Sequence, residues 1–284
     1  MALIVDLKTL FKAYKYTMAE KVSDILPDDP LAVCLNKPKD DRGNTVDAYS
    51  RFFSYMVEAN NFAAFPKILP DGKYRRLPNI VCDDDWNVRN VETLYHGFRS
   101  YDHGAAFLTD FRYHYGYGRS QGTFFSTIEN EALVYTWVNI HNENENINSD
   151  KGKILKCKVM SVNGTDYNYI RSLAVHALET PQRDYLEEFK DEDIKKIEEL
   201  QKFCFKDNLT SQDFEDYENF YRYILTNQDI FALYLGYDFL TKDKAKDVKH
   251  YIVFNRGCLV VPSSEVKKFC DKSDNYKGLE YINE

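Results

Sequence analysis

The chain has 284 residues, of which 44% are hydrophobic, enough to bury the core of one or two domains. Its 45 Asp and Glu residues outnumber its 37 Lys and Arg residues and give a net charge of −8. This acidic balance argues against a broad phosphate-binding surface, because nonspecific affinity for nucleic acid comes from clustered cations. A local basic groove is still compatible with it.

The first 18 residues, MALIVDLKTLFKAYKYTM, differ from a secretory signal because charges interrupt the apolar residues and no small-residue cleavage site follows. No apolar run approaches the roughly 18 residues that a membrane helix needs, so no membrane partner is expected. The six cysteines are scattered without a Cys-x-x-Cys pair and the six histidines are dispersed, so we expect reduced thiols and no metal site. These features predict a cytoplasmic protein, in a microbe or in a host cell that the protein enters.

Helical patterns dominate the first part of the chain. Apolar residues recur at helical spacing over residues 3–18 and again over residues 46–65. The segment ILPDGKYRRLPNIVCDDDW, residues 68–86, carries two prolines and a glycine that predict a connection rather than a helix. We therefore predict that residues 1–90 form a helical N-terminal lobe.

From residue 93 onward, short runs rich in β-branched and aromatic residues predict strands. These runs are TLYHGF (93–98), GTFFST (122–127), KILKCKVMSV (153–162) and HYIVFNRGCLVV (250–261). Between them, IENEALVYTWVNI (128–140) and residues 184–225 show helical periodicity. The strands are too few and too unevenly spaced for a βαβ array, so the sequence predicts an α+β fold with a small, strongly curved sheet.

Common catalytic and nucleotide-binding motifs are missing. The sequence contains no GxGxxG or GxxxxGK[ST] cradle for phosphates, no HExxH metal motif and no GxSxG nucleophile elbow. The remaining candidates for chemistry are two segments, LYHGF at residues 94–98 and GTFFSTIENEALVYT at residues 122–136.

These two segments resemble motifs of the ADP-ribosyltransferases of the diphtheria-toxin and poly-ADP-ribose-polymerase type, the H-Y-E branch. LYHGF resembles the first catalytic strand, which ends in aromatic-His-Gly, and GTFFSTIENEALVYT resembles a Gly-x-aromatic-Phe-small strand leading into a helix that bears a Tyr. The late segment HYIVFNRGCLVV resembles the closing strands of phage-associated and bacterial mono-ADP-ribosyltransferases. The resemblance covers residues 91–284, with a helical insertion at about 176–230, and implies the small curved split sheet of that family.

The resemblance implies that NAD is the substrate and that particular residues bind it. His96 would bond a ribose hydroxyl, and the Gly97 backbone would bond the carboxamide. Tyr135 would stack on the nicotinamide ring with Phe124 beside it. Ser126 and Asn130 would add contacts to the carboxamide or the ribose.

Four of these residues also have a structural interpretation. His96 on an apolar strand is compatible with a hydrogen-bonded core residue, and Tyr135 and Phe124 with core packing in a chain of 22 Tyr and 19 Phe. Ser126 stands three residues before Glu129, the spacing of a helix capping box.

The third catalytic position departs from the family pattern. Where the polymerase-like branch has a Glu before an aromatic residue, this chain has His250, in KHYIVF. The resemblance places Glu129 on the second motif's helix facing that position, so Glu129 is the predicted replacement. Asp238 and Glu265 are weaker candidates, and a solvated surface carboxylate is the simpler interpretation of each.

The sequence thus predicts an NAD-dependent mono-ADP-ribosyltransferase that modifies a macromolecular acceptor, a protein rather than a nucleic acid, in the manner of phage or bacterial effectors. The alternatives are a catalytically silent NAD-binding or protein-interaction module on the same fold, and an NAD glycohydrolase. The predicted catalytic residues are His96, Tyr135, Glu129 and His250.

Overall fold

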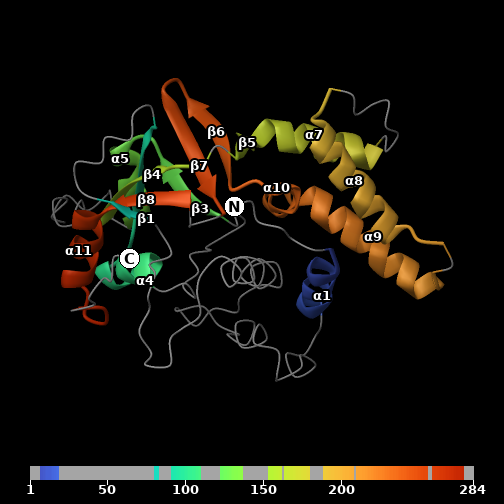
Figure 1. Ribbon diagram of the computed structural model, residues 1–284, viewed down its shortest axis with the longest axis horizontal. Helices are drawn as coiled ribbons and strands as arrows, with labels where there is room; N and C mark the ends of the chain where they lie inside the picture. The colour runs from blue at the N-terminus through green and yellow to red at the C-terminus, as the bar shows by residue number, and fades with distance from the viewer. Residues whose placement is uncertain are drawn as a thin grey trace. The chain divides into compact units, whose positions relative to one another are not determined.

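The structure is a computed structural model (Figure 1). It describes residues 7–18, 80–82, 91–109, 122–136, 153–161, 163–179, 188–207, 209–254 and 258–277. Over these ranges the chain combines helices with a mixed sheet, which confirms the α+β class. The helix predicted at residues 46–65 lies outside the described residues.

Two compact units make up the chain. The first, which we call the helical unit, comprises residues 1–57, 116–121 and 163–240; the second, the sheet unit, comprises residues 58–115, 122–162 and 241–284. This division differs from the one expected at residue 90. The strand at Ile80–Cys82 pairs with Val260–Pro262, so it belongs to the sheet rather than to an N-terminal helical lobe.

The helical unit gathers an early helix with a continuous later block. Its elements are α1 (Leu7–Met18), β5 (Gly164–Asp166), α7 (Tyr167–Glu179), α8 (Asp191–Cys204), α9 (Ser211–Thr226) and α10 (Gln228–Leu235). The helical block therefore extends beyond the 176–230 expected for the insertion. α1 joins it through aromatic packing, because the ring of Phe11 stacks on that of Tyr217 at 4.3 Å and meets Phe220 edge-on at 5.1 Å.

A buried carboxylate ties the start of α8 to its neighbours. Asp193 is 3% exposed and accepts hydrogen bonds of 2.7 Å from the hydroxyls of Tyr169 on α7 and Tyr237 before β6. Lys190 donates to Tyr237 at 3.0 Å, and its ammonium lies over the rings of both tyrosines. Because a buried carboxylate needs such partners, this cluster fixes α8 against α7.

The sheet unit carries the strands predicted from residue 93 onward. Its elements are β1 (Ile80–Cys82), β2 (Thr93–Gly97), α4 (Tyr101–Thr109), β3 (Thr123–Ser126), α5 (Glu129–Ala132), the 3₁₀ helix η2 (Leu133–Thr136), β4 (Ile154–Val159), β7 (Val248–Val253), β8 (Leu259–Pro262) and α11 (Ser263–Asp271). β6 (Phe239–Ala245) begins in the helical unit and runs on into this one. The strand order is β1-β8-β4-β2-β3-β7-β6-β5, with β1 and β8 parallel and the pairs β8-β4, β4-β2, β2-β3 and β3-β7 antiparallel.

The strand register fixes which side chains share a face. Tyr95 on β2 lies opposite Ser126 on β3, and Ser126 lies opposite His250 on β7, so these three residues stand on one face. Side chains alternate along a strand, so His96 stands on the other face. The two motif histidines are therefore separated by the sheet.

The face that carries His96 is the apolar core of the unit. Phe98 packs against Phe107 of α4 at 5.3 Å between ring centroids and against Phe269 of α11 at 5.4 Å. Gly104 lets α4 approach α11, since a Cβ there would lie 2.1 Å from the Phe269 ring. α4 and α11 thus cover this face, while α5 and η2 cover the face of Tyr95 and Ser126 (Figure 1).

Candidate functional site

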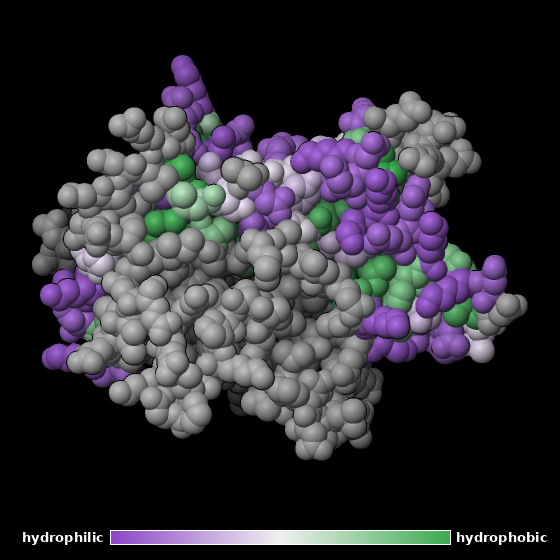
Figure 2. Space-filling model, viewed as in Figure 1, coloured by the Kyte–Doolittle hydropathy of each residue, from purple (hydrophilic) through white to green (hydrophobic). Residues whose placement is uncertain are grey.

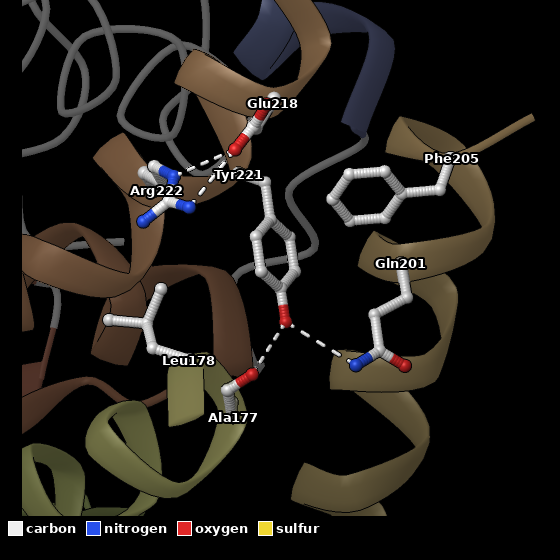
Figure 3. Close-up of a pocket in the computed structure, with 7 residues that line it drawn as sticks. All are labelled: Ala177, Leu178, Gln201, Phe205, Glu218, Tyr221 and Arg222. Atoms are coloured by element: carbon white, nitrogen blue, oxygen red, sulfur yellow. Dashed lines mark hydrogen bonds and ion pairs between the residues drawn. The ribbon is translucent and has the colours of Figure 1, made fainter. Parts of the chain in front are cut away.

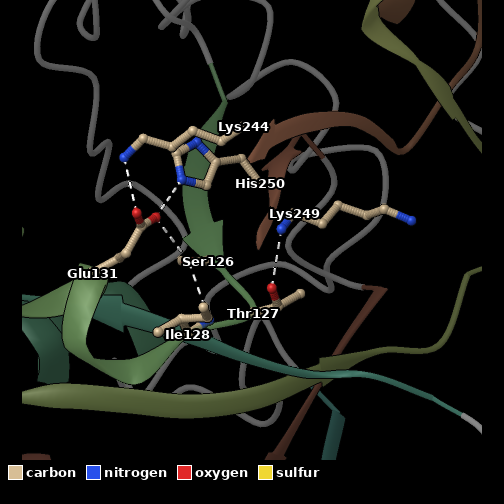
Figure 4. Close-up of polar contacts among 7 residues, drawn as sticks. All are labelled: Ser126, Thr127, Ile128, Glu131, Lys244, Lys249 and His250. Carbon is tan, nitrogen blue, oxygen red and sulfur yellow. Dashed lines mark hydrogen bonds and ion pairs between the residues drawn. The ribbon is translucent and has the colours of Figure 1, made fainter. Parts of the chain in front are cut away.

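The candidate site lies on the α5-covered face, where the three segments that resemble the family motifs become neighbours. β2, β3 and β7 are adjacent in the strand order, although long stretches of sequence separate them. The β3–β7 pairing continues past Ser126, because the Thr127 N–H donates to the Lys249 carbonyl at 3.0 Å and the Thr127 hydroxyl accepts from the Lys249 N–H at 3.1 Å (Figure 4). This pairing sets the position of His250.

Glu131, on α5, is the carboxylate that reaches His250. Its Oε2 atom lies 2.7 Å from Nε2 of His250, and its Oε1 atom accepts from the Lys244 ammonium at 2.9 Å (Figure 4). The buried Ser126 hydroxyl donates to Oε2 at 3.2 Å. We call Ser126, Glu131, Lys244 and His250 the Glu131 cluster.

Hydrogen bonding keeps the Glu131 carboxylate ionised. The bond from His250, followed by the bond from Lys244, lowers the pKa of Glu131 from 4.5 to about 2, although burial opposes the shift. The side chains of Glu131, Lys244 and His250 are 26%, 55% and 14% exposed, so the cluster is open to a ligand from the Lys244 side. It combines a partly buried negative charge with an exposed positive one.

Ser126 does not form the capping box with Glu129 that its spacing suggested. α5 begins after Ile128, and the Ser126 hydroxyl accepts from the Ile128 N–H at 3.1 Å while donating to Glu131. The serine therefore connects the end of β3 to Glu131 and holds that carboxylate over the strand.

Gly97 permits α5 to lie close to the sheet. A Cβ at Gly97 would stand 2.1 Å from the Ala132 carbonyl oxygen and 2.8 Å from the Thr136 methyl group, so only glycine fits here. The glycine of the first motif thus acts on packing: it brings the turn that bears Glu131 down onto β2.

Two aromatic side chains border the Glu131 cluster. Phe124 is half-buried, and its ring meets the His250 ring edge-on at 6.4 Å. Tyr95 is half-buried next to Ser126, and its pKa is raised by burial and then by the charge of Glu129. Together they give the site an apolar surface beside its charges.

His96, the first residue of the predicted site, lies in the core instead. It is 2% exposed, its ring packs near Phe98, Phe107 and Phe125, and its Nδ1–H donates to the Phe124 carbonyl. Burial lowers the pKa of His96 to about 4, partly offset by that hydrogen bond, so the ring is neutral. These contacts match the structural interpretation of this histidine.

The second-motif residues Glu129, Asn130 and Tyr135 are not brought to His250 by the described contacts. Glu129 and Asn130 are exposed on α5, and Tyr135 lies in η2 with a side chain outside the described residues. The structure places Glu131, rather than Glu129, against His250. Two residues along a helix turn a side chain about 200°, which carries Glu129 away from the face that Glu131 occupies.

The weaker candidates Asp238 and Glu265 have other positions. Asp238 is buried in the turn before β6, and its N–H donates to the Asn163 carbonyl. Glu265 on α11 accepts from the Lys156 N–H at 2.9 Å and from Lys268 at 2.7 Å. Its carboxylate anchors α11 to β4, so neither residue lies in the Glu131 cluster.

Sequence reasoning missed Glu131, Lys244 and Tyr95. The position of Tyr95 could have been predicted, because successive side chains of β2 point to opposite faces of the sheet. If His96 is buried on one face, Tyr95 lies on the other. Lys244 and Glu131 come together only through the β3–β7–β6 pairing, which no local pattern in the sequence specifies.

Comparison of the chain with protein-family models, curated proteins and solved structures gives no match. Every helix in the described ranges is too short or too polar to cross a membrane. Over the same ranges, no group of three or more His, Cys, Asp or Glu side chains is arranged to hold a metal ion.

Proposed function

We propose that the sheet unit is an NAD-dependent mono-ADP-ribosyltransferase domain with the split sheet of that family, acting on a macromolecular acceptor. The observation that carries the proposal is the meeting of the three motif segments as the adjacent strands β2, β3 and β7. The Glu131 cluster contains His250, the residue at the position where the family pattern has its Glu. Glu131, which comes from α5 rather than from β7, thus lies next to the position of the missing family Glu.

The chemistry of transfer suits the charges of this cluster. Cleavage of the bond between the ribose of NAD and nicotinamide develops positive charge on the ribose, which a preorganised carboxylate stabilises. Glu131 is ionised at neutral pH. Lys244 is exposed enough to leave its ion pair with Glu131 and bind an anionic group of the substrate instead, such as its pyrophosphate. The Glu131 carboxylate would then be free to interact with the ribose.

Phe124 and Tyr95 offer flat apolar surfaces for the nicotinamide ring beside that charge. His250 is oriented by its bond to Glu131, so in its neutral form the other ring nitrogen is an acceptor for a hydroxyl proton of substrate or acceptor. We therefore assign charge stabilisation to Glu131, orientation to His250 and stacking to Phe124 and Tyr95. His96 has only a structural part in this assignment.

A second candidate is a catalytically silent NAD-binding module, and the burial of His96 favours it. The resemblance gives that histidine to the ribose, yet it lies on the opposite face from His250. Without that ribose contact, turnover would be impaired, whereas Lys244 would still be available for the phosphates of NAD.

NAD labelled in its adenylate part distinguishes these functions when it is incubated with the full chain and a cell lysate. Label on macromolecules supports transfer, and its sensitivity to protease or to nuclease identifies a protein or a nucleic-acid acceptor. Free ADP-ribose alone indicates a glycohydrolase. Calorimetric NAD binding without products indicates the silent module, and absence of both binding and products rejects NAD as the ligand.

A further inference from the structure

A pocket of about 470 Å³ lies between α7, α8 and α9 of the helical unit (Figure 3). Its volume falls in the range of sites that accommodate a small ligand or an anchoring side chain. The lining residues are Ala177, Leu178, Gln201, Phe205, Glu218, Tyr221 and Arg222.

Tyr221 makes this pocket a preformed one. Its hydroxyl donates to the Ala177 carbonyl on α7 at 3.0 Å and accepts from the Gln201 amide on α8 at 3.3 Å, so one α9 side chain connects three helices (Figure 3). Burial raises the pKa of Tyr221, which keeps its proton in place as a donor. A partner therefore meets a cavity whose walls are already ordered, which lowers the entropic cost of binding.

Exposed apolar side chains continue from the pocket onto the surface. Phe205 lines the pocket and is 42% exposed, and its ring lies 6.1 Å from that of Phe214, which is 46% exposed. On α7, the exposed Val175 stands three residues before Leu178, on the same side of that helix. Figure 2 shows hydrophobic residues among hydrophilic ones over the region of α8 and α9. A hydrophobic patch around a pocket is typical of protein interaction sites.

The two helices that carry most of this patch are acidic. Residues 191–226, which span α8 and α9, contain ten Asp and Glu residues and five Lys and Arg residues. Asp193 is buried, so nine carboxylates against five cations remain in this segment, and Glu218 in the pocket lining is paired with Arg222. Helices with this excess of negative charge complement a partner that has basic side chains around apolar anchors.

We propose that the helical unit carries a docking site for a basic amphipathic segment of a partner protein, with one apolar side chain in the pocket between α7, α8 and α9 and its neighbours against Phe205 and Phe214. The proposal is independent of the function assigned to the sheet unit. Apolar side chains at helical spacing fit such a row of surface contacts, and lysines between them would meet the carboxylates in excess on α8 and α9.

Fluorescence anisotropy with the full chain tests this proposal. The probe is a labelled amphipathic peptide of about 18 residues, five helical turns, built from Leu and Lys at helical spacing. One control peptide replaces every Lys by Glu, and another scrambles the Leu positions. Phe205→Ser and Phe214→Ser are the test variants, and Met160→Ser, which loses a 44% exposed side chain of the sheet unit, is the matched control.

The expected result is saturable binding of the basic peptide that weakens as salt is raised. Either phenylalanine variant should lower the affinity about tenfold, as loss of one interface anchor does, while Met160→Ser leaves it unchanged. Thermal unfolding of all variants checks that each is folded. Equal affinity for the acidic peptide, no loss in both phenylalanine variants, or no binding overturns the proposal. Binding of dodecanoate that Phe205→Ser abolishes, without peptide binding, would instead assign the pocket to small amphipathic ligands.

Discussion

Glu131→Gln tests the charge of the Glu131 cluster while keeping the side chain's shape. The carboxylate accepts from His250 at 2.7 Å and from Lys244 at 2.9 Å. Both bonds are charge-assisted because the Glu131 carboxylate is ionised, but the Lys244 side chain is 55% exposed and Glu131 is 26% exposed, so solvent screens them. After this discount we expect the variant to lose about 1 kcal/mol of unfolding free energy at pH 7, with a fall in Tm of about 2–4 °C.

The stability that Glu131 contributes should depend on pH. The folded-state pKa of Glu131 lies near 2, below its ordinary 4.5, so the stabilisation is present above about pH 4.5 and is lost as the pH falls toward 2. Urea unfolding of wild type and Glu131→Gln should therefore give curves that differ at pH 7 and converge near pH 2. Glu129→Gln, an exposed position on the same helix, is the control and should stay within about 0.5 kcal/mol of wild type. A gap between wild type and Glu131→Gln that persists at pH 2, or an equal effect of Glu129→Gln, would refute the reasoning.

Three further predictions concern the stability of the two units. Because the pKa of His96 is lowered to about 4, wild-type stability should fall by about 3 kcal/mol as the pH drops from 6.5 to 4, and His96→Leu should flatten this slope in urea titrations. Asp193→Ala should cost about 3 kcal/mol by leaving two tyrosine hydroxyls without their acceptor, whereas the exposed Glu192→Ala should cost under about 1 kcal/mol in the same assay. Gly97→Ala should destabilise the sheet unit by about 2 kcal/mol or more, since its methyl group would meet the Ala132 carbonyl; a wild-type Tm would contradict that contact.

The strands after residue 93 were predictable because their alternation and β-branched content are local properties. TLYHGF, GTFFST and KILKCKVMSV each contain a strand of the structure, and HYIVFNRGCLVV contains the end of one and the start of another. The place of Ile80–Cys82 was not predictable, because its pairing with β8 is a long-range contact and the surrounding prolines and glycine indicate a connection.

Sequence reasoning located segments of the candidate site rather than its contacts. The segments that resemble the family motifs contain β2, β3 and β7, and the carboxylate that contacts His250 is Glu131, two residues along from the predicted Glu129. A one-turn helix that continues as 3₁₀ offers too little periodicity to orient its side chains from sequence. Likewise, the face on which His96 lies follows from strand register, which the sequence leaves open.

The most direct test of the proposed site is the rate of ADP-ribose transfer from labelled NAD in Glu131→Gln and Glu129→Gln, measured beside calorimetric NAD affinity. If Glu131 stabilises the ribose cation, its variant should lose transfer by about 100-fold or more with little change in affinity. Glu129→Gln should keep near-normal transfer and affinity. Near-normal transfer in Glu131→Gln, or no NAD binding and no transfer in the wild type, would contradict the assignment of this face as the site.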